Sequence, residues 1–437
     1  MEKIRNCFDT IIGYESIKNE LYKISHILRD TNTYTNKGIQ LPSGLLLLGD
    51  PGVGKTSMAN ALIKASERKT YVCKKDKVKG TFTSYIKSTF TRAINSGQPC
   101  IILLDDLDKF ANDDYEHCDS EEFVVVQSCM DSVKNKDIFI IATVNDIDKL
   151  PMSLYRAGRF DTHIFVENPT AEDAEAIVKY YLSNKNVVDL DYRTVSRLLG
   201  GASCAQLETV VNEAGILSLY KGHENITMDD VTRACLRIIY DAPESCIVTD
   251  PVKRMYIAMH EVGHAVVSDA LIPESVNFIS VRQHDSEIGG FTDIHDDKEN
   301  TRAFIASYEL NNICVDVAGV EAVKMFLKEV DCGGTADYRN AFNSCCKLVQ
   351  GCLIYGPEHR FGGSAYGIKD LGRDETSTRK TRKRIVKTIK QEQNRARKIL
   401  RKNKMLVQKL VEYLMQDDTM TRDKFLNIKN TVLGGRV

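Results

Sequence analysis

The stretch GDPGVGKT at residues 49–56 decides the fold of the first half of this chain. It follows the apolar run Leu45–Leu48 and precedes residues 57–63, whose composition is typical of a helix. A glycine-rich loop between a strand and a helix lets backbone N–H groups wrap nucleotide phosphates, and the helix N-terminus adds a favourable dipole. We therefore expect Lys55 to reach the β- and γ-phosphates of ATP and the Thr56 hydroxyl to ligate Mg²⁺.

Two further apolar runs end in polar side chains that suit the same site. Residues 101–106 (IILLDD) read as a buried strand ending in Asp105 and Asp106, and residues 138–143 (IFIIAT) read as another that leads to Asn145. We expect Asp105 to hold the water shell of Mg²⁺, Asp106 to activate the attacking water, and Asn145 to orient that water. Continuous apolar strands that alternate with helices indicate a parallel α/β sheet.

A second motif, HEVGH, occupies residues 260–264 within Val252–Ile272, a segment that predicts one helix. His260 and His264 are four residues apart, so both face the same side of a helix and can share one zinc ion. Glu261 is then placed to take a proton from the attacking water, while zinc polarises the scissile carbonyl. A nucleotide loop and this motif in one chain predict a motor coupled to a protease.

Composition sets broad limits on the protein class. The chain has 437 residues, enough for two or three domains, and a net charge of −1, which gives no general attraction to nucleic acid or membranes. Its 13 cysteines contain no C-x-x-C pair, so we expect reduced thiols in a reducing compartment. No apolar run is long enough to span a bilayer. These features predict a soluble, cytoplasmic protein.

The segment LYRAGRFD at residues 154–161 resembles the AAA+ ATPases and, within them, the FtsH family of ATP-dependent zinc metalloproteases. FDTIIGY at residues 8–14 is similar to the entry of the family's adenine pocket, and the resemblance covers nearly the whole chain. It implies that Arg156 and Arg159 reach the γ-phosphate bound by a neighbouring subunit. It therefore also implies a ring, normally a homo-hexamer, that acts on protein substrates.

The resemblance also assigns the remaining nucleotide contacts and the domain organisation. Residues 201–207 resemble the sensor-2 segment of a helical lid, where the part near Ala205 should approach the nucleotide. The nucleotide-binding residues are expected to be Ile12, Gly13, Asp50, Gly52, Val53, Gly54, Lys55, Thr56, Ser57 and Asp105. The expected segments are an AAA+ α/β domain at 1–168, a helical lid at 169–240, a linker at 241–250, and a mainly α-helical zinc metallopeptidase domain at 251–437.

The third zinc ligand cannot be selected from spacing alone. Glu309, Asp316, Glu321 and Asp337 all lie downstream of the HEVGH motif. The FtsH family uses an Asp at the start of a helix after a Gly- and Thr-rich turn, and CGGTAD, which ends at Asp337, matches that context. The resemblance thus implies Asp337 as the ligand, with Glu321 as the runner-up in a helix segment that does not bind metal in the family.

Two other segments of the second half carry expectations. IGGFT at residues 288–292 resembles the strand that pairs with the substrate backbone beside the zinc, which would give sequence-tolerant binding. Between Arg379 and Lys404 there are 13 Lys or Arg residues and one Glu, with apolar residues at helical spacing. We expect a helix with a solvated basic face there, in preference to a contact with nucleic acid or anionic lipid.

The sequence departs from the family in four places. Most relatives carry N-terminal membrane spans, and this chain begins at the ATPase domain, so membrane association is in doubt. Asp106 stands where a Glu is usual, and a base about an ångström out of place can slow hydrolysis. Val78 stands where the pore loop usually has an aromatic, which reduces the area available to grip a chain. The segment MDSV at 130–133 lacks the Phe of the family's intersubunit signal.

These observations predict an ATP-dependent zinc metalloendopeptidase that unfolds, translocates and degrades proteins in a ring, with one Zn²⁺ per subunit and ATP with Mg²⁺. Two alternatives remain at this level. One is a zinc peptidase of unfolded chains with a weakened motor, in which the ATPase domain mainly assembles the ring. The other is an ATP-dependent chaperone without cleavage, against which the intact set of His260, Glu261, His264 and Asp337 argues. No nucleic-acid partner is expected.

Overall fold

The chain forms two compact units, Met1–Ala234 and Cys235–Val437, each with its own hydrophobic core. The computed structural model describes residues 6–75, 82–111, 120–134, 136–156, 158–188, 190–284, 288–294, 305–330, 332–352, 354–355 and 375–434. The expected pore-loop residues Val78–Gly80 lie outside the described residues.

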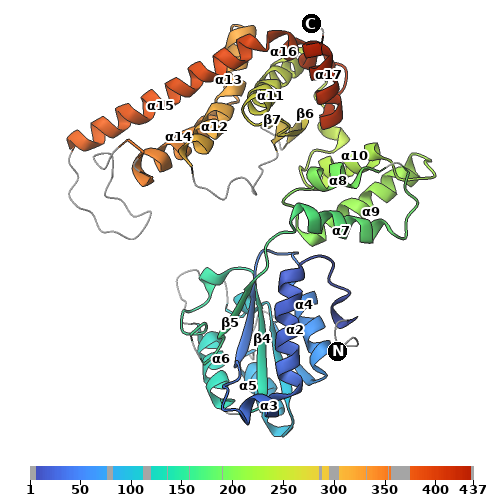
Figure 1. Ribbon diagram of the computed structural model, residues 1–437, viewed down its shortest axis with the longest axis vertical. Helices are drawn as coiled ribbons and strands as arrows, with labels where there is room; N and C mark the ends of the chain where they lie inside the picture. The colour runs from blue at the N-terminus through green and yellow to red at the C-terminus, as the bar shows by residue number, and fades with distance from the viewer. Residues whose placement is uncertain are drawn as a thin grey trace. The chain divides into compact units, whose positions relative to one another are not determined.

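The first unit is built on a five-stranded parallel sheet with the strand order β2-β3-β4-β1-β5 (Figure 1). The strands are β1 (Gly44–Leu48), β2 (Lys69–Lys74), β3 (Cys100–Asp105), β4 (Ile138–Val144) and β5 (Thr162–Phe165). Every residue of β1 and β3 is buried, as expected for central strands that are covered on both faces. The predicted parallel α/β sheet is therefore confirmed, and the carboxyl ends of β1, β3 and β4 lie side by side.

Helices cover both faces of this sheet. They are α2 (Glu15–Arg29), α4 (Lys55–Ser66), α5 (Phe82–Asn95) and α6 (Glu121–Ser132). The short helix α3 (Thr31–Thr35) follows α2 and has no buried residue, and there are 3₁₀ turns η1 (Asn6–Phe8), η2 (Leu107–Lys109) and η3 (Ile147–Lys149). α2 and α4 pack together on one face, and α5 and α6 pack on the other, where their buried apolar residues meet alternate residues of the strands (Figure 1). The glycine loop leads directly into α4, on the face of the sheet that α2 and α4 cover.

A helical lid completes the first unit. It consists of α7 (Ala171–Leu182), α8 (Tyr192–Leu198), α9 (Cys204–Tyr220) and most of α10 (Met228–Ile238). α9 begins with a capping box, in which the Ser203 side chain accepts from the Gln206 backbone N–H and the Gln206 side chain accepts from Ser203 N–H. Because both groups are satisfied there, the start of α9 is well defined, and this start faces the nucleotide loop.

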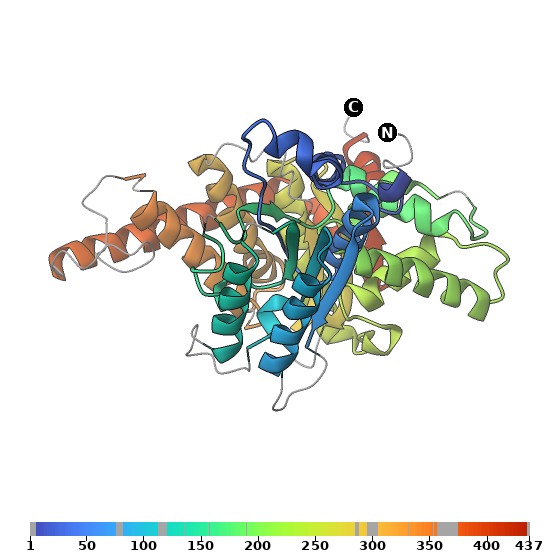
Figure 2. The same ribbon diagram turned by 90° about the horizontal axis from the view of Figure 1, so that it is seen from below.

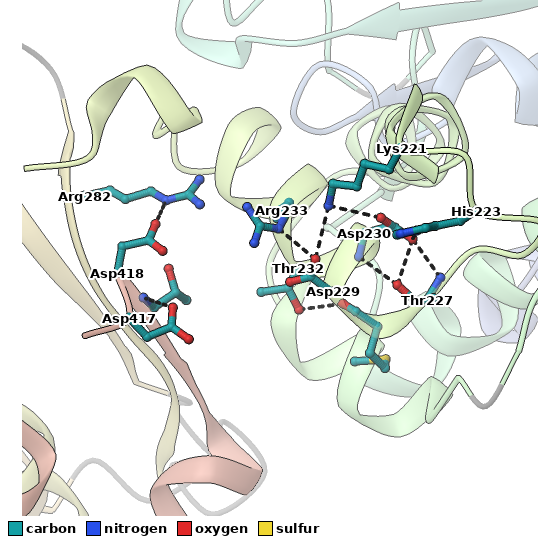
Figure 3. A network of polar contacts seen from close by, with 12 residues as sticks. Lys221, His223, Thr227, Asp229, Asp230, Thr232, Arg233, Arg282, Asp417 and Asp418 are labelled. Atoms are coloured by element: carbon teal, nitrogen blue, oxygen red, sulfur yellow. Dashed lines mark hydrogen bonds and ion pairs between the residues drawn. The ribbon is translucent and has the colours of Figure 1, made fainter. Parts of the chain in front are cut away.

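The turn between α9 and α10 is held by a buried carboxylate (Figure 3). Asp230 is fully buried and accepts hydrogen bonds from the Thr227 hydroxyl at 2.7 Å and the Thr227 N–H at 3.1 Å. His223 Nδ1 lies 3.1 Å and Lys221 Nζ 3.4 Å from the same carboxylate. Burial opposes ionisation of Asp230, but these hydrogen bonds outweigh it and lower its pKa.

The second unit is mainly helical, as predicted. Its helices are α11 (Pro251–Leu271), α12 (Ala306–Asp316), α13 (Ala318–Phe326), α14 (Thr335–Cys346), α15 (Glu375–Lys402), α16 (Lys404–Leu414) and α17 (Arg422–Gly434), with a 3₁₀ turn η4 (Glu244–Cys246) and a π-helical turn η6 (Lys347–Gly351). A small antiparallel sheet has the order β7-β6-β8, from β7 (Ile288–Ile294), β6 (Val276–His284) and β8 (Thr419–Thr421).

Helix α11 is the centre of this unit and contacts α12, α13, α15, α16, β6 and β7. Asp250 caps its N-terminus by accepting from two backbone N–H groups, and Pro251 follows at a position that tolerates proline. The buried residues of the second core come from α11, α12, α13, α15, α16 and β6, so α11 is fixed on several sides. A helix held in this way can present two side chains in a defined geometry.

The basic segment forms α15, which runs beside α12 and α14 (Figure 1 and Figure 2). The helix expected between Arg379 and Lys404 is present as α15, which ends at Lys402, and α16 begins at Lys404. Asn403 stands between them, and its side chain donates to the Ile399 carbonyl. Throughout the described part of the chain, each helix is either too short or too polar to serve as a membrane span.

Candidate functional site

The carboxyl ends of β1, β3 and β4 open into a cleft of about 1010 Å³ in the first unit. Gly52 and Gly54 take φ values of 84° and 98°, a conformation that favours glycine, and they turn the loop backbone around this cleft. The lining residues come from the loop, from the ends of the strands and from the lid: Pro51, Gly52, Gly54, Lys55, Thr56, Ser57, Lys75, Asp106, Asp108, Lys109, Ala111, Asn145, Asp146, Lys149, Tyr181, Cys204, Ala205 and Glu208. A helix N-terminus opening into such a cleft suits phosphate groups.

Lys55 is buried at the floor of the cleft. Its ammonium group donates to the Gly49 and Asp50 carbonyls at 2.6 and 2.7 Å and to Asn145 Oδ1 at 2.8 Å. Burial lowers the pKa of Lys55, and the charge of Asp108 is the largest opposing influence. The cation is therefore fixed beside the loop, where it can meet phosphate oxygens.

Asp105 and Thr56 meet at the position expected for Mg²⁺ ligation. The Thr56 hydroxyl donates to Asp105 Oδ1 at 3.0 Å, and the Thr143 hydroxyl donates to the same oxygen at 2.9 Å. Lys74 Nζ lies 2.7 Å from Asp105 Oδ2. Burial opposes ionisation of Asp105, but the hydrogen bonds from Lys74, Thr143 and Thr56 outweigh it and lower its pKa. An ionised carboxylate beside a hydroxyl is a donor set that Mg²⁺ accepts.

Asp106 and Asn145 face each other across the cleft. Asp106 has a φ of 55°, in the left-handed region, and Lys109 Nζ lies 3.0 Å from its carboxylate. Asn145 Nδ2 lies 3.5 Å from Asp106 Oδ1 and 3.4 Å from Asp108 Oδ2. The Asn145 amide therefore bridges Lys55 and the carboxylates of Asp106 and Asp108. From this position it can form a hydrogen bond with a charged group that binds beside Lys55. Asp108 was not identified from the sequence, because it follows the strand in a 3₁₀ turn with no pattern of its own.

The segment expected to form the adenine pocket lies against the lid. Gly13 has a φ of 71°, and a Cβ there would stand 2.5 Å from Asp173 Oδ1. Tyr14 donates its N–H to Asp173 at 3.0 Å, and its hydroxyl lies 3.5 Å from Cys204 Sγ. Ile12 and Gly13 are not among the described residues that line the cleft, and neither are Asp50 and Val53.

The two arginines of residues 154–161 have different environments. Arg156 is exposed and forms no hydrogen bond or ion pair with any residue that the structure describes. Arg159 donates to the Ser153 carbonyl at 2.6 Å and lies 2.9 Å from Asp131. Hydrogen bonds from Arg159 and Lys134 lower the pKa of Asp131 to about 2. Arg159 is thus engaged within its own chain, whereas Arg156 has no polar partner among the described residues.

In the second unit, α11 and α14 bring His260, His264 and Asp337 together. The Nε2 atoms of the two histidines are 2.9 Å apart, and Asp337 Oδ2 lies 3.0 Å from His260 Nε2 and 3.6 Å from His264 Nε2. This is the one cluster of three or more potential metal ligands among the described residues. Asp337 lies in the first turn of α14, as the resemblance implied.

These three side chains fit zinc. Donors about 2.0–2.2 Å from a tetrahedral zinc ion are separated by roughly 3.3–3.6 Å, within a few tenths of an ångström of the separations found here. His264 Nδ1 lies 2.7 Å from the Val315 carbonyl, which fixes the proton on Nδ1 and leaves the Nε2 lone pair for a metal. Burial opposes ionisation of Asp337, but its close contacts with the His260 and His264 imidazoles outweigh it and lower its pKa.

Glu261 is buried beside this cluster and is held by the edge strand β7. The Thr292 hydroxyl lies 2.8 Å from Glu261 Oε2 and 3.0 Å from the Glu261 carbonyl. Burial raises the pKa of Glu261, although the charges of His260 and His264 oppose this shift. Thr292 was not singled out in the sequence, because a Thr in a strand is ordinary and its contact depends on how β7 packs on α11.

The other acidic candidates have different surroundings. Glu321 is 1% exposed and is paired with Arg397, whose Nε and Nη2 lie 2.5 and 3.0 Å from its two oxygens. Glu309 lies 3.1 Å from Lys347 Nζ. Asp316 is partly buried near the cluster, and burial raises its pKa to about 6. None of these three belongs to the ligand cluster described above.

Comparisons with known proteins match one family to the first half of the chain and another to the second half. Residues 45–168 match the family model of the ATPase family associated with various cellular activities (AAA), and residues 247–428 match peptidase family M41. The chain is 26% identical to ATP-dependent zinc metalloprotease FtsH 3 of Petrotoga mobilis, over 96% of this chain and 68% of that protein. It is 28% identical to ATP-dependent zinc metalloprotease FtsH of Halothermothrix orenii, over 93% and 68%. The protein of that name from Thermotoga maritima is 27% identical, over 97% and 73%.

Proposed function

Because the chain belongs to the FtsH family of ATP-dependent zinc metalloproteases, we propose that it unfolds, translocates and degrades protein substrates in a homo-hexameric ring. The proposed cofactors are one Zn²⁺ per subunit and ATP with Mg²⁺. One observation carries the proposal. A single chain holds a cleft lined by the glycine loop and Lys55 in its first unit and a His260–His264–Asp337 cluster next to a buried carboxylate in its second.

The proposed peptidase chemistry uses few side chains. Zinc bound by His260, His264 and Asp337 would polarise the scissile carbonyl and lower the pKa of a bound water. Glu261 takes the proton of the attacking water and later delivers it to the leaving amine. Thr292 holds the Glu261 carboxylate in its orientation through the 2.8 Å hydrogen bond. β7 is the terminal strand of this sheet in the described part of the chain, a position that suits pairing with an extended substrate backbone.

The proposed ATPase chemistry uses the cleft of the first unit. Lys55 neutralises charge on the β- and γ-phosphates, and Thr56 with Asp105 holds Mg²⁺. Asp106 and Asn145 orient the attacking water, since they face each other beside Lys55. The exposed position of Arg156 supports a role in the neighbouring subunit's site.

We expect Asp337→Ala to lower zinc affinity by more than about 100-fold, because it removes a ligand and not merely an outer partner of one. Zinc content after dialysis and competition with a chromogenic chelator would measure the change. Glu309→Ala is the matched control, since it removes an acidic residue that lies outside the ligand cluster and is paired with Lys347. Zinc loss from the control with retention in Asp337→Ala would mean that the assigned ligand is wrong.

The proposed function is tested with one stably folded and one unfolded protein substrate, each with ATP, with no nucleotide, and with a non-hydrolysable analogue. A ring that unfolds and translocates should degrade the folded substrate only with hydrolysable ATP. A chelator should abolish cleavage of both substrates, and zinc should restore it. Cleavage that survives complete zinc removal, or no cleavage by the zinc-loaded protein, would contradict the proposal.

A second candidate, a zinc peptidase of unfolded chains with a weakened motor, is favoured by Asp106. The carboxylate at this position is one methylene shorter than the usual Glu, and Lys109 holds it at 3.0 Å. A catalytic base that is displaced from its usual position lowers the rate of ATP hydrolysis. The same experiment distinguishes the candidates, because this one predicts cleavage of the unfolded substrate in all three nucleotide conditions and no cleavage of the folded substrate.

A further inference from the structure

Three consecutive residues of α13, Gly319, Val320 and Glu321, form a segment that lies against the metal ligands, here named the support segment. Gly319 is so close to both imidazoles that a Cβ on it would stand 2.5 Å from His264 Nε2 and 2.6 Å from His260 Nε2. A Cβ on Gly334, the N-cap of the helix that carries the third ligand, would overlap the Val320 side chain. The support segment therefore contacts the surroundings of all three ligands.

The position of α13 against α11 is equally close. A Cβ on Gly263, which lies between the two histidines in sequence, would stand 2.7 Å from Ala322 Cβ and 2.8 Å from the Ala318 carbonyl. The two helices thus cross through small residues with no flexible side chain between them. A shift of α13 along this crossing would be passed directly to the imidazole rings, because packed backbones do not deform gradually.

One side chain from a distant part of the sequence fixes the support segment. Arg397 of α15 reaches Glu321 with Nε at 2.5 Å and Nη2 at 3.0 Å from the two carboxylate oxygens. The side chain of Glu321 is 1% exposed and that of Arg397 is 33% exposed, so the ion pair is shielded from solvent on the side of α13. Two parallel bonds to a planar carboxylate hold an orientation as well as a distance.

We propose that Arg397 is a positioning residue of the zinc site, which acts by locking Glu321 and with it the support segment against His260, His264 and Gly334. This inference rests on the proposed zinc site and deepens it. Metal sites tolerate deviations of only about 0.2 Å in ligand distances, so a small movement of α13 changes affinity before it changes the fold. The basic helix α15 therefore helps to set the geometry of the metal site.

The same helix provides a matched control. Arg395 lies 3.3 Å from Glu392, a carboxylate that is also mostly buried, and donates to Asn311 Oδ1 at 2.8 Å in α12. Loss of Arg395 therefore removes a guanidinium from a buried carboxylate without touching the support segment. A general loss of stability would follow from either variant, but a change at the metal should follow only from loss of Arg397.

The experiment compares Arg397→Met, Glu321→Gln and Arg395→Met in the full chain. Zinc affinity is measured by chelator competition, the Co²⁺-substituted protein is examined by its d–d absorption spectrum, and folding is checked by circular dichroism. We expect zinc affinity to fall about 10- to 100-fold in Arg397→Met, the size typical of lost outer partners of metal ligands, with a shifted Co²⁺ spectrum. Glu321→Gln keeps the shape and leaves no buried charge, so it decides the matter if Arg397→Met does not fold.

Arg395→Met should keep zinc affinity within about threefold and an unchanged Co²⁺ spectrum, because its partners do not adjoin the ligands. Wild-type affinity and spectrum in folded Arg397→Met, or in Glu321→Gln if the former does not fold, would overturn the proposal. Equal changes in Arg395→Met would also overturn it, since the effect would then be general. A wild-type chain that binds no zinc would instead contradict the proposed function, so the two failures are distinct.

Discussion

Glu261→Gln should lose peptide cleavage by on the order of 10²–10⁴-fold while zinc content and ATP hydrolysis stay near those of the wild type. The amide has the size of the carboxylate and can still accept the hydrogen bond that Thr292 Oγ1 makes at 2.8 Å. It cannot take a proton from water. The measurement is initial-rate cleavage of a short fluorogenic peptide, which requires no unfolding and therefore reports the chemistry alone.

The control for this variant is Asp269→Asn, another change from buried acid to amide on the same helix. Asp269 lies near the C-terminal end of α11 and is paired with Lys429 at 2.6 Å, away from the metal ligands. It should cleave the peptide within about threefold of the wild type, because no reacting group is touched. Cleavage by zinc-loaded Glu261→Gln at the wild-type rate would exclude Glu261 as the base.

The sheet of the first unit follows from local sequence because its central strands are buried on both faces. Runs such as Leu45–Leu48 and residues 101–104 carry only apolar residues, and the glycine loop after the first run marks where that strand ends. The break between α15 and α16 was not predictable in this way. Apolar residues continue at helical spacing past Asn403, and the side-chain bond from Asn403 to the Ile399 carbonyl becomes visible only in the structure.

Helical periodicity predicts two of the three ligands in the metal cluster but not the third. Two histidines four residues apart meet on any helix, so His260 and His264 could be paired from the sequence alone. Asp337 depends on the path of the chain through α12 and α13, which spacing does not contain, and it was identified only from the resemblance. The partners Thr292 and Arg397 gave no signal, because each contacts the site through packing between elements far apart in the sequence.

Arg156→Ala should bind ATP with near-normal affinity but hydrolyse it on the order of 10³-fold more slowly, if its guanidinium stabilises the transition state in the neighbouring subunit. The side chain is exposed and unpaired among the described residues, so its removal breaks no polar contact that the structure describes. Arg159→Ala is a contrasting variant, since it also breaks the ion pair with Asp131 at 2.9 Å. Steady-state ATPase rates and nucleotide-binding titrations measure the two effects separately.

Mixing the inactive Arg156→Ala protein with inactive Lys55→Ala protein provides the decisive control. In a ring, each site combines Lys55 of one subunit with Arg156 of the next, so a mixed ring contains some interfaces in which both side chains are intact. Random mixing of equal amounts should restore up to about a quarter of the wild-type ATPase rate. No recovery in rings shown to exchange subunits, or full activity of a diluted monomer, would contradict action in trans. Recovery would show that two defective chains complete one site, which a residue acting within its own chain cannot do.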